Sequence, residues 1–308
     1  MKLKNLIVKK TRSLIGNPSI HAFDMIEPSR KNAKILLGRM LARLNSQLPA
    51  DAAISEMEFQ VFSQFGDDGI IQFLISRLPI SSRTFIEFGV EDYQESNTRF
   101  LLVNNRWTGL IIDGGPENVR FIKQDGVYFA HRLHVEQAFI TRENINELLA
   151  RAEFPEEVGL LSIDIDGNDY WIWEAINVVR PTIVVIEYNS AFGPENQWTI
   201  PYEPDFQWKN EGAASYYWGA SLAAFTALGK SKGYDLFGCN SAGNNAYFIR
   251  QDRRGSLRRT EVSEAFVEGQ FALGLDEHGN PVRGTAGMRH LRGKAVFDVA
   301  TKSERLIP

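Results

Sequence analysis

The sequence of 308 residues contains a single cysteine, Cys239, and no long hydrophobic segment. One cysteine excludes an intramolecular disulfide and a zinc site built on cysteines, and it favours a reducing compartment. No apolar run approaches the roughly 18 to 20 residues that a helix needs to cross a bilayer. The run LIV near the N-terminus is interrupted by Lys9 and Lys10, so the apolar core of a signal peptide is missing. We therefore expect a cytoplasmic protein.

Acidic residues outnumber basic ones over the whole chain, but the N-terminal segment is basic. The chain has 34 Lys and Arg against 38 Asp and Glu, a net charge of −4, which argues against nucleic acid as a partner. Residues 1–50 carry ten Lys and Arg against only Asp24 and Glu27, a local charge of +8. This segment is therefore the candidate for contact with an anionic partner or a membrane surface.

The stretch KNAKILLGRMLARLNSQL predicts an amphipathic helix inside this basic segment. Its expected apolar face consists of Ile35, Leu36, Met40, Leu41 and Leu44. A basic amphipathic helix can lie on an anionic membrane, dock on a partner, or pack on its own domain. We favour packing on its own domain and keep peripheral membrane contact as the alternative.

Residues 56–252 alternate apolar strand-like runs with helical segments, which predicts a Rossmann-like, doubly wound, mostly parallel α/β sheet. Five strands are expected at TFIE, TGLIID, VYFAHRL, LLSIDID and TIVVIE. YDLFGCN and NNAYFIR should form an antiparallel hairpin that closes a seven-stranded sheet. A helical N-terminal extension over residues 1–55 precedes this domain. The segment 253–308 lacks clear periodicity, and we expect it to pack on the domain or to mediate self-association as a homo-oligomer.

Four of the expected strands end in carboxylates. These acids are Glu87, Asp113, the pair Asp164 and Asp166, and Glu187. In an open α/β sheet, ligands bind just outside the carboxyl ends of the parallel strands. A buried carboxylate is costly unless it is paired, hydrogen-bonded or bound to a metal. Four acids at equivalent positions therefore indicate one shared site.

The turn after the first strand, IEFGVEDYQESNT, indicates the chemistry of the first ligand. A dinucleotide fingerprint needs G-x-G-x-x-G, but only Gly89 is present, and Glu91 stands where a second glycine would be. A pyrophosphate would meet acids here, whereas a cationic ligand without phosphates, such as S-adenosylmethionine, fits better. Asp113, some twenty residues further on, suits a bidentate hydrogen bond to ribose hydroxyls.

The run SIDIDGNDYWIW has the highest density of hard oxygen ligands. Asp164 and Asp166 are two residues apart, so on a continuing strand they would share one face. Glu187 and Asn189 follow the next strand and could complete a shell for Mg²⁺ or Ca²⁺. The same residues could instead bind the ammonium group of the cofactor and supply a general base. The sequence leaves these alternatives open.

Aromatic residues are concentrated in the long stretch from Asn189 to Trp218. This set comprises Phe192, Trp198, Tyr202, Phe206, Trp208, Tyr216, Tyr217 and Trp218. Aromatic faces beside amides suit stacking on sugar rings or other flat, hydroxylated substrates. The alternative is a satellite hydrophobic cluster beneath a long loop.

With the Glu87-Phe-Gly89 turn, Asp113, the IDIDGNDYW run and the closing hairpin, the chain resembles class I S-adenosylmethionine-dependent methyltransferases. It is more narrowly similar to the FkbM-like group, through SQFGDDGII, FIEFGV, SNTRFLL, W-x-GLIIDG and SIDIDG. The resemblance covers residues 56–252. It implies that Glu87 and Gly89 face the methionine part of the cofactor, Asp113 the ribose, and Asp164 the neighbourhood of the sulfonium. O-methylation is the activity it implies most often.

Metal-dependent O-methyltransferases use an acid after the fourth strand and an acid/amide pair after the fifth. The set Asp164 or Asp166 with Glu187 and Asn189 is similar to that pattern, except that Tyr188 separates the last two residues. The resemblance therefore implies a Mg²⁺ or another divalent cation as a candidate cofactor beside S-adenosylmethionine.

We expect an O-methyltransferase that acts on a hydroxyl of a sugar, a glycan or a glycosylated natural product. Asp166 or Asp164 would accept the hydroxyl proton. The alternative is a non-catalytic binding or assembly protein that retains the methyltransferase fold.

Overall fold

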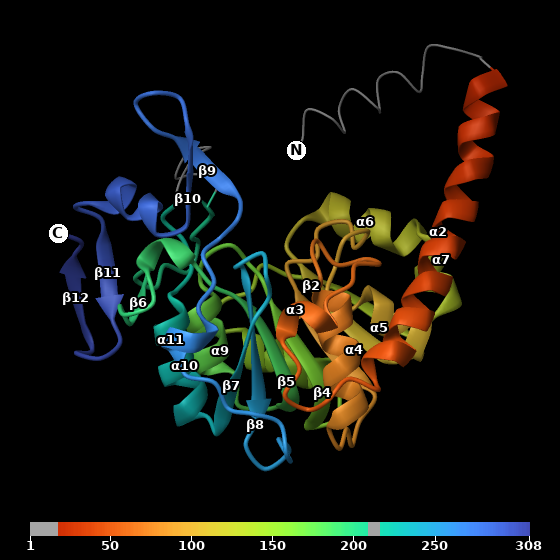
Figure 1. The fold of residues 1–308 in the computed structure, drawn as a ribbon, viewed down its shortest axis with the longest axis horizontal. Coiled ribbons are helices and arrows are strands. Elements are labelled where there is room, and N and C mark those ends of the chain that lie inside the picture. Colours follow the sequence, from red (N-terminus) through yellow and green to blue (C-terminus); the bar gives the residue numbers. More distant parts are fainter. Residues whose placement is uncertain (1–17, 209–215) are drawn as a thin grey trace.

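The computed structural model describes residues 18–208 and 216–308, with side chains of the first helix described from residue 30 onward. Its centre is a seven-stranded sheet with the order β3-β2-β1-β4-β5-β8-β7 (Figure 1). These strands are β1 (Thr84–Phe88), β2 (Thr108–Asp113), β3 (Leu133–Gln137), β4 (Glu157–Ile163), β5 (Arg180–Glu187), β7 (Tyr234–Cys239) and β8 (Asn245–Arg250). Strands β1 to β5 pair in parallel, and β8 runs antiparallel between β5 and β7. The predicted Rossmann-like sheet with a closing hairpin is confirmed.

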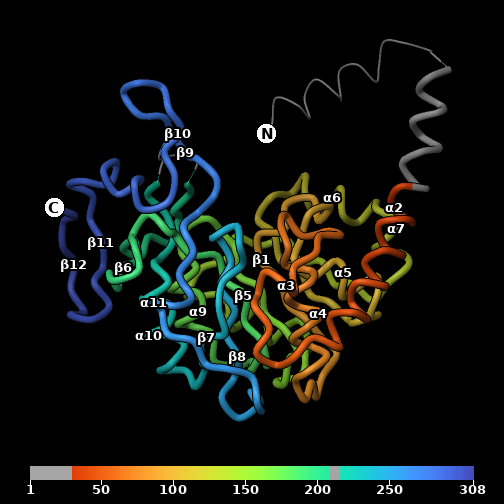
Figure 2. The backbone as a smooth tube through the Cα atoms, viewed as in Figure 1, coloured from red at the N-terminus to blue at the C-terminus, as the bar shows by residue number. Residues whose placement is uncertain are grey.

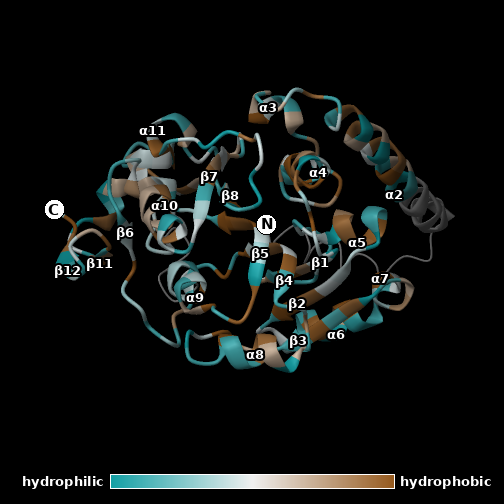
Figure 3. Ribbon diagram, turned by 90° about the horizontal axis from the view of Figure 1, so that it is seen from below, coloured by the Kyte–Doolittle hydropathy of each residue, from teal (hydrophilic) through white to brown (hydrophobic). Residues whose placement is uncertain are grey.

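Helices cover both faces of the sheet, because the central strands are apolar on both sides. One face packs on α8 (Ile145–Arg151), α9 (Asp169–Ala175) and α10 (Leu222–Ser231). The other packs on α4 (Asp67–Arg77), α5 (Arg99–Asn105), α6 (Pro116–Gln124) and α7 (Gly126–Ala130). Figure 3 shows α4 and α5 on one side of the strands and α8 and α9 on the other.

The third strand lies further along the chain than the sequence predicts. Part of the predicted strand VYFAHRL forms the short helix α7, and β3 begins only at Leu133. The carboxylate of Asp125 accepts a hydrogen bond from the backbone N–H of Val127 and so caps this helix. The prediction of a strand from residue 127 was therefore wrong.

The fourth strand ends earlier than predicted. β4 stops at Ile163, and Asp166 adopts a left-handed conformation with φ of 57°. Asp164 and Asp166 are therefore brought together by a turn rather than by a continuing strand.

The long helix α2 (Pro18–Asn45) packs on one end of the domain through its C-terminal part (Figure 1). Ile35 and Leu41 pack against the cluster Phe59, Val61, Phe62 and Phe100. Leu36, Met40 and Leu44 point away from it and are exposed. The residues of the predicted apolar face thus lie on two sides of the helix, and the domain buries only one of these sides. The basic residues that precede Pro18 lie outside the described residues.

The C-terminal segment packs on the aromatic stretch at the opposite end of the molecule (Figure 2). The hairpin of β9 (Ala272–Leu275) and β10 (Pro281–Arg283) is followed by η3 (Gly284–Leu291). β11 (Ala295–Asp298) pairs with β12 (Ser303–Leu306) and with the short β6 (Trp198–Thr199). The remaining short elements are α3 (Ile54–Met57), η1 (Ser190–Phe192) and α11 (Val262–Ala265).

Candidate functional site

A cavity of about 380 Å³ opens at the carboxyl edge of the parallel strands. Loops after β1, β2, β3 and β4 form its walls, and the aromatic stretch contributes its outer side. Its lining consists of Gly89, Glu91, Ile112, Asp113, Gly114, Gly115, Asn118, Ala138, Phe139, Ile140, Asp164, Ile165, Asp166, Asn168, Phe206, Gln207 and Trp208. Four lining residues are Asp or Glu, and none of the described lining residues is Lys, Arg or His.

Gly89 forms the floor of the cavity, where the chain leaves β1. Its φ is +71°, and a Cβ built there would lie 1.6 Å from the carbonyl oxygen of Asp164. Its N–H donates to the carbonyl of Ile112 at 3.1 Å. No side chain fits between the β1 and β4 loops at this point, so a glycine is required.

Glu87 does not line the cavity. Its carboxylate is buried and accepts hydrogen bonds from the Ser96 hydroxyl (2.7 Å), the Asn97 N–H (2.9 Å) and the Thr98 N–H (3.2 Å). Burial raises its pKa, and these hydrogen bonds partly offset the rise. In this structure Glu87 holds the loop before α5, so we assign it a structural role instead of the predicted contact with the cofactor.

Asp113 lies on the cavity wall at the end of β2. One carboxylate oxygen accepts from the Gly115 N–H (2.7 Å) and the Asn118 amide (2.9 Å), and the other from the Glu91 N–H (2.9 Å). These bonds fix the carboxylate, and the second oxygen, with one donor, can accept another.

The turn after β4 is held by Asp169, not by the two acids before it. The buried Asp169 carboxylate accepts from the N–H groups of Ile165 and Gly167, each at 2.9 Å. Burial raises its pKa to about 6. Asn168 is buried in the cavity wall and donates to the Glu203 carbonyl at 2.8 Å. The turn thereby presents Asp164 and Asp166 to the cavity.

Asp164, Asp166 and Glu187 form a carboxylate cluster, with one oxygen from each within 4.8 Å of the others. Asp164 and Glu187 are partly buried, and Asp166 is exposed. Burial first, and then repulsion from neighbouring acids, holds the pKa of both Asp164 and Glu187 well above the ordinary range. Each of these two carboxyls therefore keeps its proton to a higher pH than an ordinary carboxyl does.

Asn189 takes no part in this cluster. Its amide donates to the carbonyls of Tyr216 (2.7 Å) and Trp218 (2.9 Å), and its oxygen accepts from the Ala191 N–H. The side chain is buried and fully engaged with the backbone, so we remove it from the predicted metal ligands. The three carboxylates that remain are hard oxygen donors of the kind that Mg²⁺ and Ca²⁺ prefer.

Most of the aromatic stretch forms a satellite core rather than a binding surface. Phe192, Trp198 and Tyr216 are buried against the C-terminal segment, and the Tyr216 hydroxyl donates to the Val282 carbonyl at 2.9 Å. Among the described aromatic residues of this stretch, Phe206 and Trp208 line the cavity. A Cβ on Gly167 would meet the Phe206 ring at 2.3 Å, so the ring lies directly on the β4 turn.

Phe139 and Asn118 line the cavity although the sequence did not predict them as site residues. Phe139, which is 46% exposed, lies just after β3. The predicted third strand ends at residue 133, so Phe139 was not expected at the end of a strand. Asn118 is in α6 and reaches back to Asp113. The position of Asn118, five residues after the acid that ends β2, is the feature of the sequence that indicates this contact.

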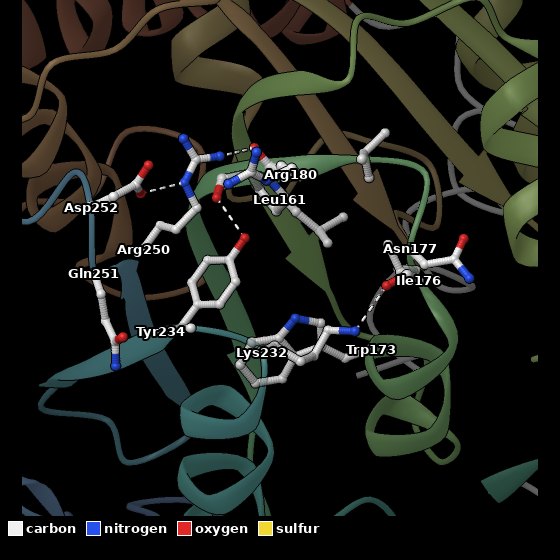
Figure 4. Close-up of a pocket in the computed structure, with 13 residues that line it drawn as sticks. Leu161, Trp173, Ile176, Asn177, Arg180, Lys232, Tyr234, Arg250, Gln251 and Asp252 are labelled. Atoms are coloured by element: carbon white, nitrogen blue, oxygen red, sulfur yellow. Dashed lines mark hydrogen bonds and ion pairs between the residues drawn. The ribbon is translucent and has the colours of Figure 1, made fainter.

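A second cavity, of about 450 Å³, opens at the opposite end of the strands (Figure 4). Its cationic groups are already engaged. Arg250 donates to both oxygens of Glu157 and bonds Asp252, and Lys232 donates to the carbonyls of Glu174 and Ile176. These contacts join the ends of strands and helices. We therefore infer that Arg250 and Lys232 stabilise the fold and do not bind a ligand.

Comparisons with protein-family models and with curated proteins give no match. Among solved structures, the chain is similar to a putative caffeoyl-CoA O-methyltransferase from Staphylococcus aureus, with 12% identity, a TM-score of 0.41, and coverage of 74% of this chain and 98% of that one. The N-terminal domain of EvdMO1 with SAH bound matches with 12% identity, a TM-score of 0.40, and coverage of 68% and 94%. The CurJ carbon methyltransferase matches with 9% identity, a TM-score of 0.39, and coverage of 76% and 71%.

These similarities are too low to assign a family. No helix within residues 18–208 and 216–308 is long and apolar enough to span a membrane.

Proposed function

We propose that the chain is an S-adenosylmethionine-dependent methyltransferase that methylates a hydroxyl of a sugar, a glycan or a glycosylated natural product. The observation that carries the proposal is the charge of the cavity. Its described lining includes the four acids Glu91, Asp113, Asp164 and Asp166. Such a cavity repels pyrophosphate and attracts a ligand with sulfonium and ammonium groups. It therefore disfavours a dinucleotide or a nucleotide-sugar.

Three features of the cavity walls support this cofactor. The fixed carboxylate of Asp113 is placed to accept hydrogen bonds from ribose hydroxyls. Phe139 offers an exposed ring beside it for the adenine. The backbone at Gly89 approaches Asp164 closely, which brings the floor of the cavity next to the carboxylate cluster.

The cofactor, when bound, supplies an electrophilic methyl group on a positively charged sulfur. The chain has to hold the acceptor oxygen in line with that methyl group at about 3 Å and remove the hydroxyl proton. Asp166 is the exposed member of the cluster and is the acceptor we favour for that proton. The pKa of Asp164 and that of Glu187 are both raised, so their combined negative charge stays below that of two free carboxylates.

The class of acceptor is inferred from three residues that the aromatic stretch contributes to the cavity lining. Phe206, Gln207 and Trp208 lie together there, and rings beside an amide are suited to stacking on a sugar and bonding its hydroxyls. These residues are the described part of the aromatic stretch that lines the cavity.

A divalent cation is a second use of the carboxylate cluster. Asp164, Asp166 and Glu187 would hold it, and it would lower the pKa of a coordinated hydroxyl. Calorimetry with MgCl₂ in the absence of any other ligand tests this role. Heat of binding that is lost in Glu187→Gln supports it, and no heat with the wild-type protein contradicts it.

Isothermal titration calorimetry with S-adenosylmethionine tests the cofactor, with NAD⁺ as the comparison ligand. Asp113→Asn should weaken S-adenosylmethionine binding by about tenfold or more, because a charged hydrogen bond contributes roughly 1.5 to 3 kcal/mol. The exposed Asp51→Asn should leave binding unchanged and serves as the control.

Release of S-adenosylhomocysteine with sugar acceptors tests catalysis separately. Asp166→Asn should still bind the cofactor, more weakly because one cavity charge is lost, and should lower the transfer rate at saturating cofactor by roughly 100-fold or more. If Asp166→Asn transfers methyl groups at the wild-type rate, its assignment as proton acceptor is wrong. If no hydroxylated acceptor is methylated although the cofactor binds, the non-catalytic binding protein becomes the better account.

A further inference from the structure

The outward face of α2 carries large apolar side chains that the domain does not cover. Their exposed fractions are 58% for Leu36, 55% for Leu37, 62% for Met40 and 59% for Leu44. At 100° per residue, these four positions fall within an arc of about 100° around the helix. They form a continuous apolar stripe, which we call the outer stripe.

The helix cannot rotate to bury this stripe, because its opposite side is fixed to the domain. A Cβ on Gly38 would lie 2.4 Å from Val61, so the helix backbone is in close contact there. The Asn45 amide, at the end of the helix, donates to the carbonyls of Met57 and Gly69. The outer stripe is therefore held in an exposed position.

Basic residues border the outer stripe on both sides. On the helical projection, Arg39 and Arg43 lie along one border, and Arg30 and Lys34 along the other. All four are exposed. Residues 30–45 contain no Asp or Glu. An apolar stripe between two basic borders is the pattern of a helix that lies in the plane of an anionic membrane surface.

We propose that the outer stripe of α2 docks on an anionic phospholipid surface. The four apolar side chains would enter the boundary between head groups and acyl chains, and the basic borders would face lipid phosphates. Charge distinguishes this partner from a second copy of the chain. Two copies joined through the stripe would bring basic borders together with no acid on either helix segment to pair with them. The proposal is independent of the methyltransferase proposal.

Co-sedimentation of the full-length chain with vesicles tests the proposal. Vesicles of phosphatidylcholine alone are compared with vesicles that also contain phosphatidylglycerol. The protein should bind the anionic vesicles, and high salt should weaken the binding, since salt screens the basic borders. Met40→Gln/Leu44→Gln should lower the partition coefficient by about tenfold or more without any change in charge. Lys34→Gln/Arg43→Gln should lower it to a similar degree.

Matched variants control for changes made elsewhere on the surface. Leu275 and Leu306 are 61% and 65% exposed on C-terminal strands, so Leu275→Gln/Leu306→Gln makes the same chemical change away from α2. Arg292→Gln/Lys302→Gln makes the same charge change. Both control variants should bind the anionic vesicles as the wild type does.

Three results would overturn the proposal, two from the vesicle assay and one from light scattering. The first two are an absence of binding to phosphatidylglycerol vesicles, and binding that Met40→Gln/Leu44→Gln does not weaken. The third is a wild-type dimer in light scattering that Met40→Gln/Leu44→Gln converts to a monomer, because a second copy would then cover the stripe. Circular dichroism of each variant confirms that α2 and the domain are folded.

Discussion

Gly89 shows how a single position joins two loops of the site. It has a positive φ, and its missing side chain leaves room for the carbonyl of Asp164. The sequence indicates that a turn follows β1, but the contact with a residue 75 positions later depends on the order of strands in the sheet. The hydrogen bonds of Glu87 with Ser96 and Thr98 could not be predicted either. In the sequence, the segment that contains Ser96 and Thr98 is equally compatible with an open loop.

Gly89→Ala should destabilise the protein by about 3 kcal/mol or more, because backbone strain and steric overlap each contribute roughly 1 to 3 kcal/mol. Gly219 also has a positive φ, but a Cβ there would meet nothing within 4 Å. Gly219→Ala should therefore cost only the strain, about 1 to 2 kcal/mol. Urea unfolding measures both. Equal losses in the two variants would show that the contact with Asp164 is not tight.

Glu187→Gln should make stability less dependent on pH. The pKa of Asp164 and of Glu187 is raised in the native state, so unfolding releases protons that the native state keeps. Their stabilising contribution is complete below about pH 4 and is lost as pH rises through the raised pKa values. The variant removes one acid and its repulsion of the other. It should therefore lose less stability than the wild type between acidic and alkaline pH.

Urea unfolding across this pH range, without ligands, measures the effect. The exposed Glu195→Gln is the control and should follow the wild type. A Glu187→Gln profile that falls as steeply as the wild type would contradict the raised pKa values.

At the scale of elements, burial decides which strands can be predicted. β1, β2, β4 and β5 lie inside the sheet and are apolar on both faces, so their runs are conspicuous in the sequence. β3 is an edge strand with the mixed sequence LHVEQ. The run VYFAHRL before it is more apolar and therefore resembles a strand more closely in the sequence. In the structure, Asp125 caps a helix there. Short apolar runs fit a helix or a strand equally well until a cap is identified.

The C-terminal strands were not predicted, because each is only three or four residues long. Their stability comes from packing on the aromatic stretch. That packing also explains why most of the aromatic residues are buried instead of facing a substrate.

The two faces of α2 should respond differently to substitution. Gly38→Leu places a large side chain against Val61 and Phe100, where even a Cβ would lie at 2.4 and 3.0 Å. It should destabilise the protein by roughly 2 kcal/mol or more. Leu37→Ala, the neighbour on the exposed face, should change stability by less than about 0.5 kcal/mol. Urea unfolding of both variants is the measurement, and a neutral Gly38→Leu would show that α2 is not docked tightly.

At the scale of the whole molecule, the sheet separates three regions with different chemistry. The acidic cavity lies at the carboxyl edge of the strands, α2 packs at one end of the molecule, and the C-terminal strands pack at the other (Figure 2). The sequence predicted the fold and gathered Asp113, Asp164, Asp166 and Glu187 at one edge. It could not separate cavity acids from buried ones, because that depends on which loops cover which strand end.

The central claim is that the cavity lined by Glu91, Asp113, Asp164 and Asp166 selects a cationic cofactor. Calorimetric titration of the wild-type chain with S-adenosylmethionine and, in parallel, with NAD⁺ tests it most directly. The account predicts saturable binding of S-adenosylmethionine at micromolar to submillimolar concentration and no binding of NAD⁺. Binding of NAD⁺, or no binding of S-adenosylmethionine at millimolar concentration, would contradict it.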